Sequence, residues 1–334
     1  MTGKPRAFSG IQPTGGIHIG NYLGAIRNWV LQQDQYDNIF SIVDLHAMTL
    51  PYDASELRSR TIEVASALLA AGIDPQRSIL FVQSEVREHT ELCWILGTLA
   101  TFGELRRMTQ FKEKSKGSER VGAGLFFYPV LQAADILLYD AAVVPVGEDQ
   151  KQHIELTRDL AIRFNHTFGE TFVVPEPDIK PAGARIMSLT DPLKKMSKSD
   201  PDPDSRIELR DPPDEIRRKI RRAVTDSEAE VRFDEERKPA ISNLLTIYSL
   251  FADIPIPELE RRYAGKGYSE FKRDLAEVII AGLQPIQQRL DELAADPGIV
   301  IRTLKEGAAR ARELAVAKMA VVRERCGLGL PPLD

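Results

Sequence analysis

Short apolar runs alternate with helical segments through the first half of the chain, and this alternation limits the available folds most strongly. Residues 38–44, 78–83 and 141–146 are compact apolar runs typical of buried strands, with helical spacing between them. Strands that alternate with helices pair in parallel through right-handed crossovers. The alternation then stops, and only helical patterns follow. We therefore predict an α/β protein, with a Rossmann-like parallel sheet in residues 1–190 and an all-helical unit in residues 191–334.

A strand, a Pro/Gly turn and the start of a helix follow one another near the N-terminus. Phe8 belongs to the strand, and residues 12–16 form the turn QPTGG. His18 and Asn21 then lie at the helix start, where free backbone N–H groups and the helix dipole favour a phosphate group. We predict a phosphate-binding turn at this point. The motif GxGxxG is missing from this turn, so a nicotinamide dinucleotide site is disfavoured.

Two other segments carry positive charge suited to an anionic ligand. In the stretch LKKMSKSDP, residues 193–201, Lys194, Lys195 and Lys198 are interleaved with serines, and no apolar period would bury them. Residues 104–124 also carry a local excess of positive charge, although the whole chain has a net charge of -5. We predict that this second segment is a basic helix running into a loop that faces phosphates.

Polar side chains also occur in apolar surroundings further along the chain. Tyr128, Gln132 and Asp135 fall at i, i+4 and i+7 of a predicted helix, so they share one face. Burying the carboxylate of Asp135 is costly without a partner, so we expect it to meet a donor from the protein or from a ligand. His46 follows the strand 38–44, where open α/β sheets place their ligands. From its position, His46 is equally a structural histidine or a ligand-binding one.

Two short signatures and several longer segments resemble the class I aminoacyl-tRNA synthetases. The sequence HIGN at 18–21 is similar to the HIGH signature of that class, and KMSKS at 195–199 is its second signature. With IVDLHAMT, GELRRMTQFKEKS, VPVGEDQKQHIELTRDLAIRFN and ISNLL, the chain resembles bacterial tryptophanyl-tRNA synthetases over most of its length. The resemblance implies a Rossmann catalytic domain in residues 1–190. It also implies a KMSKS loop with a helical anticodon-binding domain in residues 191–334, and a homodimer.

The resemblance further implies a reaction and a set of site residues. ATP with Mg²⁺ would activate L-tryptophan, which would then be transferred to tRNA(Trp). The catalytic group would contain Lys195, Lys198, Lys114 and His18. The residues that would hold ATP are Gln12, Pro13, Thr14, Gly20, Asn21, Gly147, Glu148, Asp149, Ile186, Lys195, Met196, Ser197, Lys198 and Ser199. The residues that would bind tryptophan are Phe8, Val43, His46, Tyr128, Gln132, Asp135, Val144, Val146 and Gln150, with Asp135 accepting the indole N–H.

Two positions depart from the usual family pattern, and the second keeps another function open. His18 stands where threonine is frequent, which brings the turn nearer to the consensus of the class. Gln132 stands where many bacterial members have methionine. Tyr128, Gln132 and Asp135 then resemble the substrate helix of tyrosyl-tRNA synthetases, which makes a tyrosyl enzyme the main alternative. A small-molecule nucleotidyltransferase would not account for the helical unit. A non-catalytic paralogue that binds tRNA or protein would have no chemical need for the intact lysines and Asp135.

The remaining features predict a cytoplasmic protein without a metal centre of its own. No apolar run approaches the ~18 residues of a membrane span, and residues 1–8 lack the hydrophobic region of a signal peptide. The two cysteines, Cys93 and Cys326, have neither metal-ligand nor CxxC spacing. This spacing fits a reducing compartment better than a disulfide framework. We expect no membrane contact.

Overall fold

The structure is a computed structural model of the 334-residue chain that describes residues 3–14, 16–114, 121–147, 150–178 and 185–330. The side chains of residues 113–114 and 177–178 are outside this description. Five strands form one sheet in the order β3–β2–β1–β4–β5, and every pair is parallel. Their bounds are β1 (Arg6–Ile11), β2 (Asp37–Ile42), β3 (Ile79–Val82), β4 (Val143–Pro145) and β5 (Glu176–Asp178). The predicted α/β fold with a parallel sheet is confirmed.

The strand order creates a natural position for a ligand. Because β2 lies on one side of β1 and β4 lies on the other, the sheet grows in opposite directions from β1. Ligands of open α/β sheets bind outside the carboxyl ends of the strands at such a switch point. Phe8 pairs in register with Ile39, and Ala7 pairs with Val143. The segments that follow β1, β2 and β4 therefore meet at one edge of the sheet.

The helices of the sheet region follow the predicted alternation, with one exception. The helix after β1 has three parts, α1 (Ile19–Asn21), the π-helical turn η1 (Tyr22–Ile26) and α2 (Arg27–Leu31). The others are α3 (Asp44–Ala47), α4 (Ala54–Ala71), η2 (Gln83–Glu85), α5 (Glu88–Gly97), α6 (Phe102–Arg107), α7 (Thr109–Lys114), α8 (Ala123–Leu137) and α9 (Lys151–Phe168). The single basic helix predicted from residue 104 is wrong. It is broken at Met108, which has an extended backbone with a ψ of 125° and a buried side chain.

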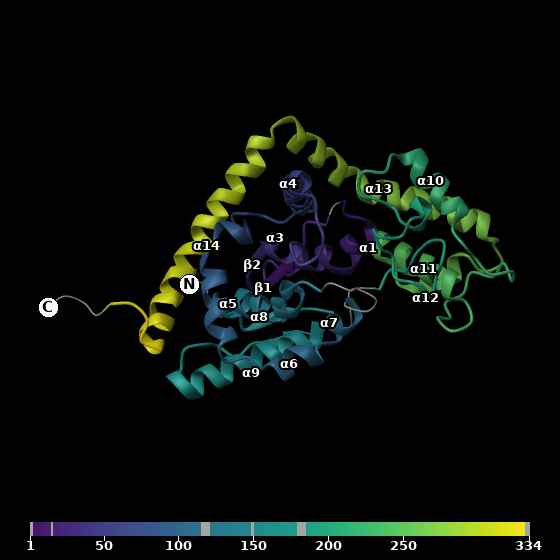
Figure 1. Ribbon diagram of the computed structural model, residues 1–334. Helices are drawn as coiled ribbons and strands as arrows, with labels where there is room; N and C mark the ends of the chain where they lie inside the picture. Colours follow the sequence, from purple (N-terminus) through teal and green to yellow (C-terminus); the bar gives the residue numbers. More distant parts are fainter. Residues whose placement is uncertain (1–2, 15, 115–120, 148–149, 179–184, 331–334) are drawn as a thin grey trace.

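The second half of the chain is helical, as predicted. It contains η4 (Pro203–Ser205), α10 (Pro213–Arg222), α11 (Pro239–Ala252), α12 (Ile256–Arg262), α13 (Tyr268–Ala295) and α14 (Pro297–Cys326). Figure 1 shows α10 to α13 grouped at one end of the molecule and α14 running back along the sheet. Buried side chains of α11 and α13, such as Leu245 and Leu275, share one hydrophobic core with Leu68 of α4. The helical group is therefore joined to the sheet region by apolar packing.

Helix α14 belongs to the core of the sheet region. Its buried side chains, among them Ala311, Ala315 and Met319, cluster with Phe81 of β3. A Cβ added at Gly307 would overlap the carbonyl oxygen of Leu80, so only glycine permits this approach to β3. Because β3 is an end strand of the sheet, α14 covers its free edge. A division of the chain at 190/191 stays a prediction, but residues 191–334 do not form one separate core.

Two further helices bear on the expected absence of membrane contact. Among the described residues, no single helix has the length and apolar composition needed to cross a membrane. Helices α11 and α12 meet that test only as a pair, across a bend of 106°.

Candidate active site

A cavity of about 300 Å³ opens at the carboxyl ends of β1 and β4, which is the switch point of the sheet. Its volume is in the range of small-molecule binding sites. The cavity brings together every residue predicted to bind tryptophan, namely Phe8, Val43, His46, Tyr128, Gln132, Asp135, Val144, Val146 and Gln150. Gln12, predicted to hold ATP, also lines it, whereas Ser9, Gly10 and Gln110 are lining residues that sequence reasoning missed. One concave site therefore contains apolar walls with a few polar groups.

Asp135 is the most constrained polar group of this cavity. Its side chain is 1% exposed, and its Oδ1 accepts hydrogen bonds from Gln83 Nε2 at 2.7 Å and His89 Nδ1 at 2.6 Å. His46 Nε2 lies 2.7 Å from Oδ2. Asp135 therefore meets protein donors, which confirms that it needs a partner. A carboxylate has about four acceptor positions, and three donors are described, so Oδ2 retains room for a ligand N–H.

The histidine partners of Asp135 also keep it ionised. Burial on its own would raise the pKa of Asp135, but the charge and hydrogen bond of His46, then those of His89, outweigh burial and lower it. On its far side, His89 Nε2 lies 2.8 Å from the hydroxyl of Tyr139, whose pKa is raised by burial and then by Asp135. The network fixes the carboxylate in one orientation within an apolar surrounding.

The polar stripe predicted on α8 exists and is held by neighbouring helix residues. Tyr128 places its hydroxyl 2.8 Å from His153 Nε2, and Gln132 Nε2 donates to Gln150 Oε1 over 3.3 Å. His46 meets the ring of Tyr128 edge-on, with ring centroids 6.1 Å apart. His46 therefore has the structural role of supporting Asp135, and it also lines the cavity, while its binding of a ligand stays a prediction.

The HIGN turn, residues 18–21, forms the start of helix α1, the first helix after the cavity strand β1. The backbone N–H of His18 donates to Asn21 Oδ1 over 3.2 Å, so the asparagine closes the helix start. A Cβ added at Gly20 would lie 2.9 Å from the His18 ring and 3.3 Å from Met196. Glycine at this position therefore lets the HIGN turn contact the KMSKS loop, residues 195–199. Gln12 and Thr14 are exposed, whereas Pro13 is buried.

His18 is held in its neutral form. The side chain is buried, and Nδ1 has no hydrogen-bond partner among the described residues. Burial, followed by the charges of Arg206, Lys195 and Lys198, lowers the pKa of His18 from 6.5 to about 4. At neutral pH the imidazole therefore adds no positive charge beside the two lysines.

The KMSKS loop is anchored by its buried methionine and exposes its lysine side chains to different degrees. Met196 is 2% exposed and donates its backbone N–H to Ile186 O over 3.0 Å. Lys195 is exposed, whereas Lys198 is half-buried and lines a second cavity with Glu63 and Glu208. Burial lowers the pKa of Lys198, against the opposing effect of Glu63.

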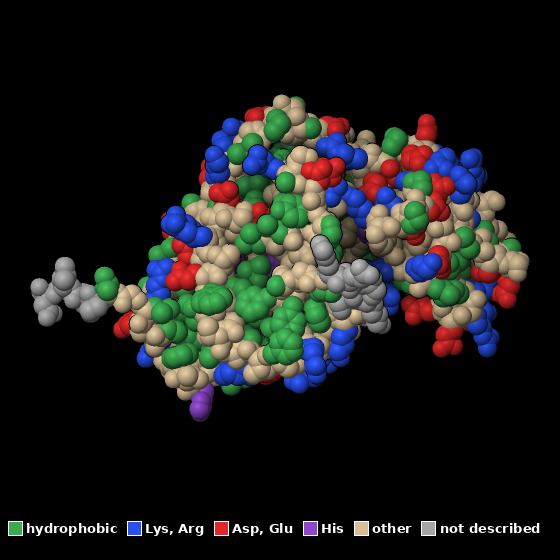
Figure 2. All heavy atoms as spheres, viewed as in Figure 1, with side chains coloured by type: hydrophobic (Ala, Val, Ile, Leu, Met, Phe, Trp, Pro, Cys, Tyr) green, Lys and Arg blue, Asp and Glu red, His purple; other side chains and the backbone are tan. Residues whose placement is uncertain are grey.

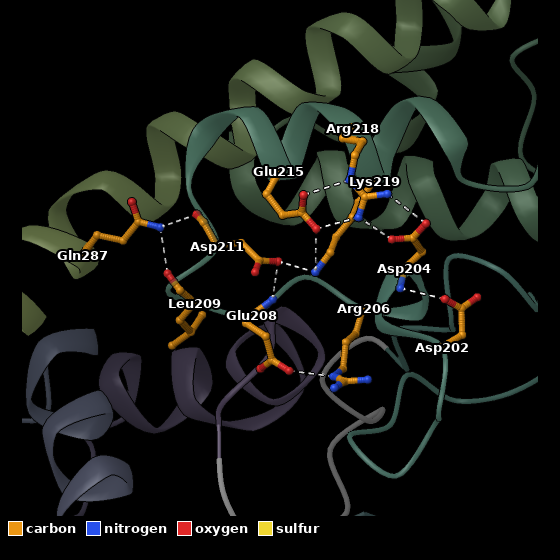
Figure 3. Close-up of polar contacts among 10 residues, drawn as sticks. All are labelled: Asp202, Asp204, Arg206, Glu208, Leu209, Asp211, Glu215, Arg218, Lys219 and Gln287. Carbon is orange, nitrogen blue, oxygen red and sulfur yellow. Dashed lines mark hydrogen bonds and ion pairs between the residues drawn. The ribbon is translucent and has the colours of Figure 1, made fainter.

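The chain after the KMSKS loop pairs with the HIGN turn. Ile19 N donates to Ile207 O and Leu209 N donates to Ile17 O, both over 2.9 Å. Asp211 then accepts from the backbone of Glu208 at 3.0 Å and from the 4% exposed Lys219 of α10 at 2.7 Å. Figure 3 shows this network, in which α10 and Gln287 of α13 hold the paired segment from the helical side. The HIGN turn is thus fastened to the helical group through residues 207–211.

Three arginines of α10 are held in ion pairs and do not form a free basic face. Arg217 pairs with Glu277 at 2.7 Å, and Arg222 pairs with Asp204 at 2.9 Å. Arg218 also binds Asp204, over 3.0 Å. These ion pairs neutralise much of the positive charge of α10. The arginines therefore hold α10 against neighbouring segments of the chain.

Three predicted site residues fall partly or wholly outside the described structure. Glu148 and Asp149 lie outside the described residues, and Lys114 lies in α7 without a described side chain. Gly147 is described beside the cavity residue Val146, and Ile186 is 1% exposed. Its backbone oxygen accepts from Met196 of the KMSKS loop.

Comparisons with known proteins agree on one family. The family model described as tRNA synthetases class I (W and Y) matches residues 1–284. The tryptophan–tRNA ligase of Caldanaerobacter subterraneus subsp. tengcongensis is 58% identical over 97% of this chain and 98% of its own length. The crystal structure of tryptophanyl-tRNA synthetase from Mycoplasma pneumoniae is 36% identical, covers 98% of each chain and has a TM-score of 0.89. That of the Campylobacter jejuni enzyme, complexed with ADP and tryptophan, is 37% identical, with a TM-score of 0.84 over 97% of this chain and 100% of its own.

Proposed function

This chain belongs to the class I tRNA synthetases for tryptophan and tyrosine, and from that premise we propose that it charges tRNA(Trp) with L-tryptophan. In the first step, tryptophan and ATP give tryptophanyl-adenylate and pyrophosphate. In the second step, a ribose hydroxyl of the terminal tRNA adenosine takes the acyl group and releases AMP. The observation that carries this proposal is the fixed Asp135 carboxylate inside a cavity lined by Phe8 and valines.

Asp135 selects the amino acid by its remaining acceptor position. The indole N–H of tryptophan donates to Oδ2, while Phe8, Val43 and Val144 cover the ring faces. Phenylalanine lacks a donor and leaves the buried carboxylate without its ligand partner. Sites built to hydrogen-bond a substrate reject such analogues by ~10⁴-fold or more. The phenol of tyrosine also carries a donor, so the choice of tryptophan over tyrosine rests on the similarity to tryptophan enzymes.

The chemistry of the first step requires alignment and charge neutralisation more than proton transfer. The tryptophan carboxylate is ionised at neutral pH, so it attacks the α-phosphorus without a side-chain base. Lys195 and Lys198 neutralise the charge that develops on the phosphates, and Lys114 assists from its own segment. His18, neutral at this pH, offers a ring N–H as a hydrogen-bond donor without adding charge. Gln12 and Thr14 from the turn after β1, with Gly20 and Asn21 from the HIGN turn, hold ATP opposite the KMSKS loop.

Magnesium enters this scheme with the nucleotide. Among the described residues, no group of three or more His, Cys, Asp or Glu side chains is arranged to hold a metal ion. In this scheme the phosphates of ATP would supply most ligands of Mg²⁺, as is usual for this ion. When bound, Mg²⁺ contributes positive charge to the phosphates. The ATP-binding roles of Pro13, Gly147, Glu148, Asp149, Ile186, Met196, Ser197 and Ser199 are part of this proposal.

A homodimer is the proposed assembly. Figure 2 shows hydrophobic side chains gathered on the face over α5 and α8. Trp94 of α5 is 72% exposed and Phe102 of α6 is 69% exposed, and the ring of Phe102 lies 5.0 Å from that of Phe126. Large exposed apolar surfaces of this kind mark protein contacts. A second copy of the chain fits this surface as the partner.

The test of the proposed function is ATP–pyrophosphate exchange by the purified protein with tryptophan, tyrosine or phenylalanine supplied separately. Exchange with tryptophan alone is the expected result. Exchange with tyrosine in place of tryptophan would overturn the substrate and leave the two-step chemistry intact. A folded protein that binds tRNA(Trp) but supports no exchange would instead be a non-catalytic paralogue.

A further inference from the structure

The side-chain amide of Asn243 forms two hydrogen bonds with the backbone of Met187, near the KMSKS loop. Asn243 lies on α11 and is 6% exposed. The backbone N–H of Met187 donates to its Oδ1 over 2.8 Å, and its Nδ2 donates to Met187 O over 3.0 Å. One amide thus satisfies both backbone groups of Met187, as a neighbouring strand would.

The opposite side of the same backbone segment is paired with the KMSKS loop. Met187 and Lys195 form an antiparallel bridge. Ser188 N donates to Lys194 O over 2.8 Å, and Met196 N donates to Ile186 O over 3.0 Å. In this arrangement the N–H and C=O of Met187 point away from Lys195 and would lack backbone partners. The amide of Asn243 fills that position, so the segment 186–188 lies between Asn243 and the loop.

Helix α11 makes this contact rigid. Its side chains Leu244, Leu245 and Tyr248 are buried in the core that joins α11, α13 and α4. A movement of Asn243 relative to Met187 would therefore require α11 to leave a packed core. We propose that Asn243 is a positioning residue, which holds the KMSKS loop through Met187 so that Lys195 and Lys198 reach the ATP phosphates in register.

The chemistry of the contact requires an amide. Aspartate has the same shape, but a carboxylate oxygen would replace the donor Nδ2. That oxygen would face the carbonyl oxygen of Met187, and the hydrogen bond to this carbonyl would be lost. Serine is too short to reach both backbone groups. Asn243 itself has both its oxygen and its nitrogen engaged with Met187, which leaves the amide no direct role with substrate.

The expected consequence follows from the proposed function, on which this inference rests. A misplaced KMSKS loop leaves the tryptophan cavity intact, since its described lining comes from residues 8–150. Displacing reacting groups by about 1 Å can cost ~10²-fold in rate. Asn243→Asp should therefore lower kcat for ATP–pyrophosphate exchange by about 10- to 100-fold and leave the KM for tryptophan within about twofold.

The experiment compares Asn243→Asp with Thr246→Val, a matched change that removes a hydroxyl from the same helix without touching Met187. Exchange kinetics give kcat and the KM for tryptophan, and tryptic cleavage after Lys194, Lys195 and Lys198 reports the order of the loop. We expect Asn243→Asp alone to lower kcat and to speed cleavage several-fold. An unchanged kcat and cleavage rate, or an equal loss of kcat and tryptophan binding, would overturn the inference.

A second variant and the wild-type activity separate loss of folding and failure of the proposed function from loss of the positioning role. If Asn243→Asp does not unfold cooperatively, Asn243→Ser is measured in the same way and carries the same expectation. If the wild-type protein shows no exchange with any amino acid, the proposed function fails. The tryptic cleavage of the loop then decides the positioning role on its own, with unchanged cleavage refuting it.

Discussion

Lowering the pH should reduce the free energy of unfolding of this protein, in part because His18 becomes protonated. The ring is 4% exposed, and burial together with Arg206, Lys195 and Lys198 lowers its pKa from 6.5 to about 4. Between these two values the unfolded chain binds the proton and the folded chain does not, so the free energy of unfolding rises with pH in that window. The linked stability is fully present above pH 6.5 and is lost as the pH falls to about 4.

The size of this effect follows from the same two pKa values. The complete loss is about 3 kcal/mol, and about 2 kcal/mol of it has occurred at pH 5. This is a large share of the ~5–15 kcal/mol that stabilises a typical domain. Burial is the largest single cause of the lowered pKa, and its contribution should persist in salt, which mainly screens exposed charges.

Urea unfolding between pH 4.5 and 7.5 measures the effect in the wild type and in His18→Gln. The glutamine variant keeps a polar side chain that does not titrate, and all other carboxylates and histidines are common to both proteins. The wild type should therefore lose about 2 kcal/mol more than the variant between pH 7.5 and pH 5. Parallel curves for the two proteins would refute the reasoning, as would an NMR titration that places the His18 ring near its ordinary pKa.

Three other perturbations have signs that follow from the described contacts. Lys198→Ala should slow single-turnover adenylate formation by about 10²- to 10³-fold with little change in tryptophan binding; a defect in binding alone would contradict its charge role. Asp135→Ala leaves three buried donors without their acceptor, so it should cost about 3–5 kcal/mol in urea unfolding and lose selectivity for tryptophan. Retained discrimination against phenylalanine in the exchange assay would rule out that role. Gly307→Ala should destabilise the protein because the methyl group meets the carbonyl of Leu80, whereas Gly103→Ala, in an open helical position, should stabilise it by about 0.5–1 kcal/mol. Equal shifts of the two urea midpoints would show that α14 does not approach β3 so closely.

The parts of the molecule that could be predicted from sequence are those encoded by neighbouring residues. The strands, the HIGN turn, the KMSKS loop and the stripe on α8 each depend on a local pattern of a few residues. The partners of Asp135 could not be found in this way, because Gln83 and His89 lie 52 and 46 positions away. Gln83 does follow a strand, so the rule that indicated His46 applies to it equally. His89 has no comparable local signal.

Ion pairing and close packing limited prediction in the helical half. The arginines of α10 have the spacing of an exposed basic face, but Arg217 finds Glu277 from a helix 60 positions away. Residues 308–320 are rich in alanine at helical spacing, but such a spacing does not indicate which surface the helix packs against. Packing also limited prediction in the sheet region, where the break at Met108 depends on a side chain that enters the core and outweighs the helical preference of its charged neighbours.

The return of α14 to the sheet has a consequence for how the chain folds as it is made. Arg310 donates to the carbonyl of Ser78, which precedes it by 232 positions, so β3 emerges from the ribosome long before its cover does. At ~5–20 residues per second, the free edge of β3 waits for roughly ten seconds or longer. An uncovered edge strand is a template for pairing with other chains. A chain truncated between α13 and α14 never covers this edge, and it is therefore expected to aggregate unless chaperones bind it.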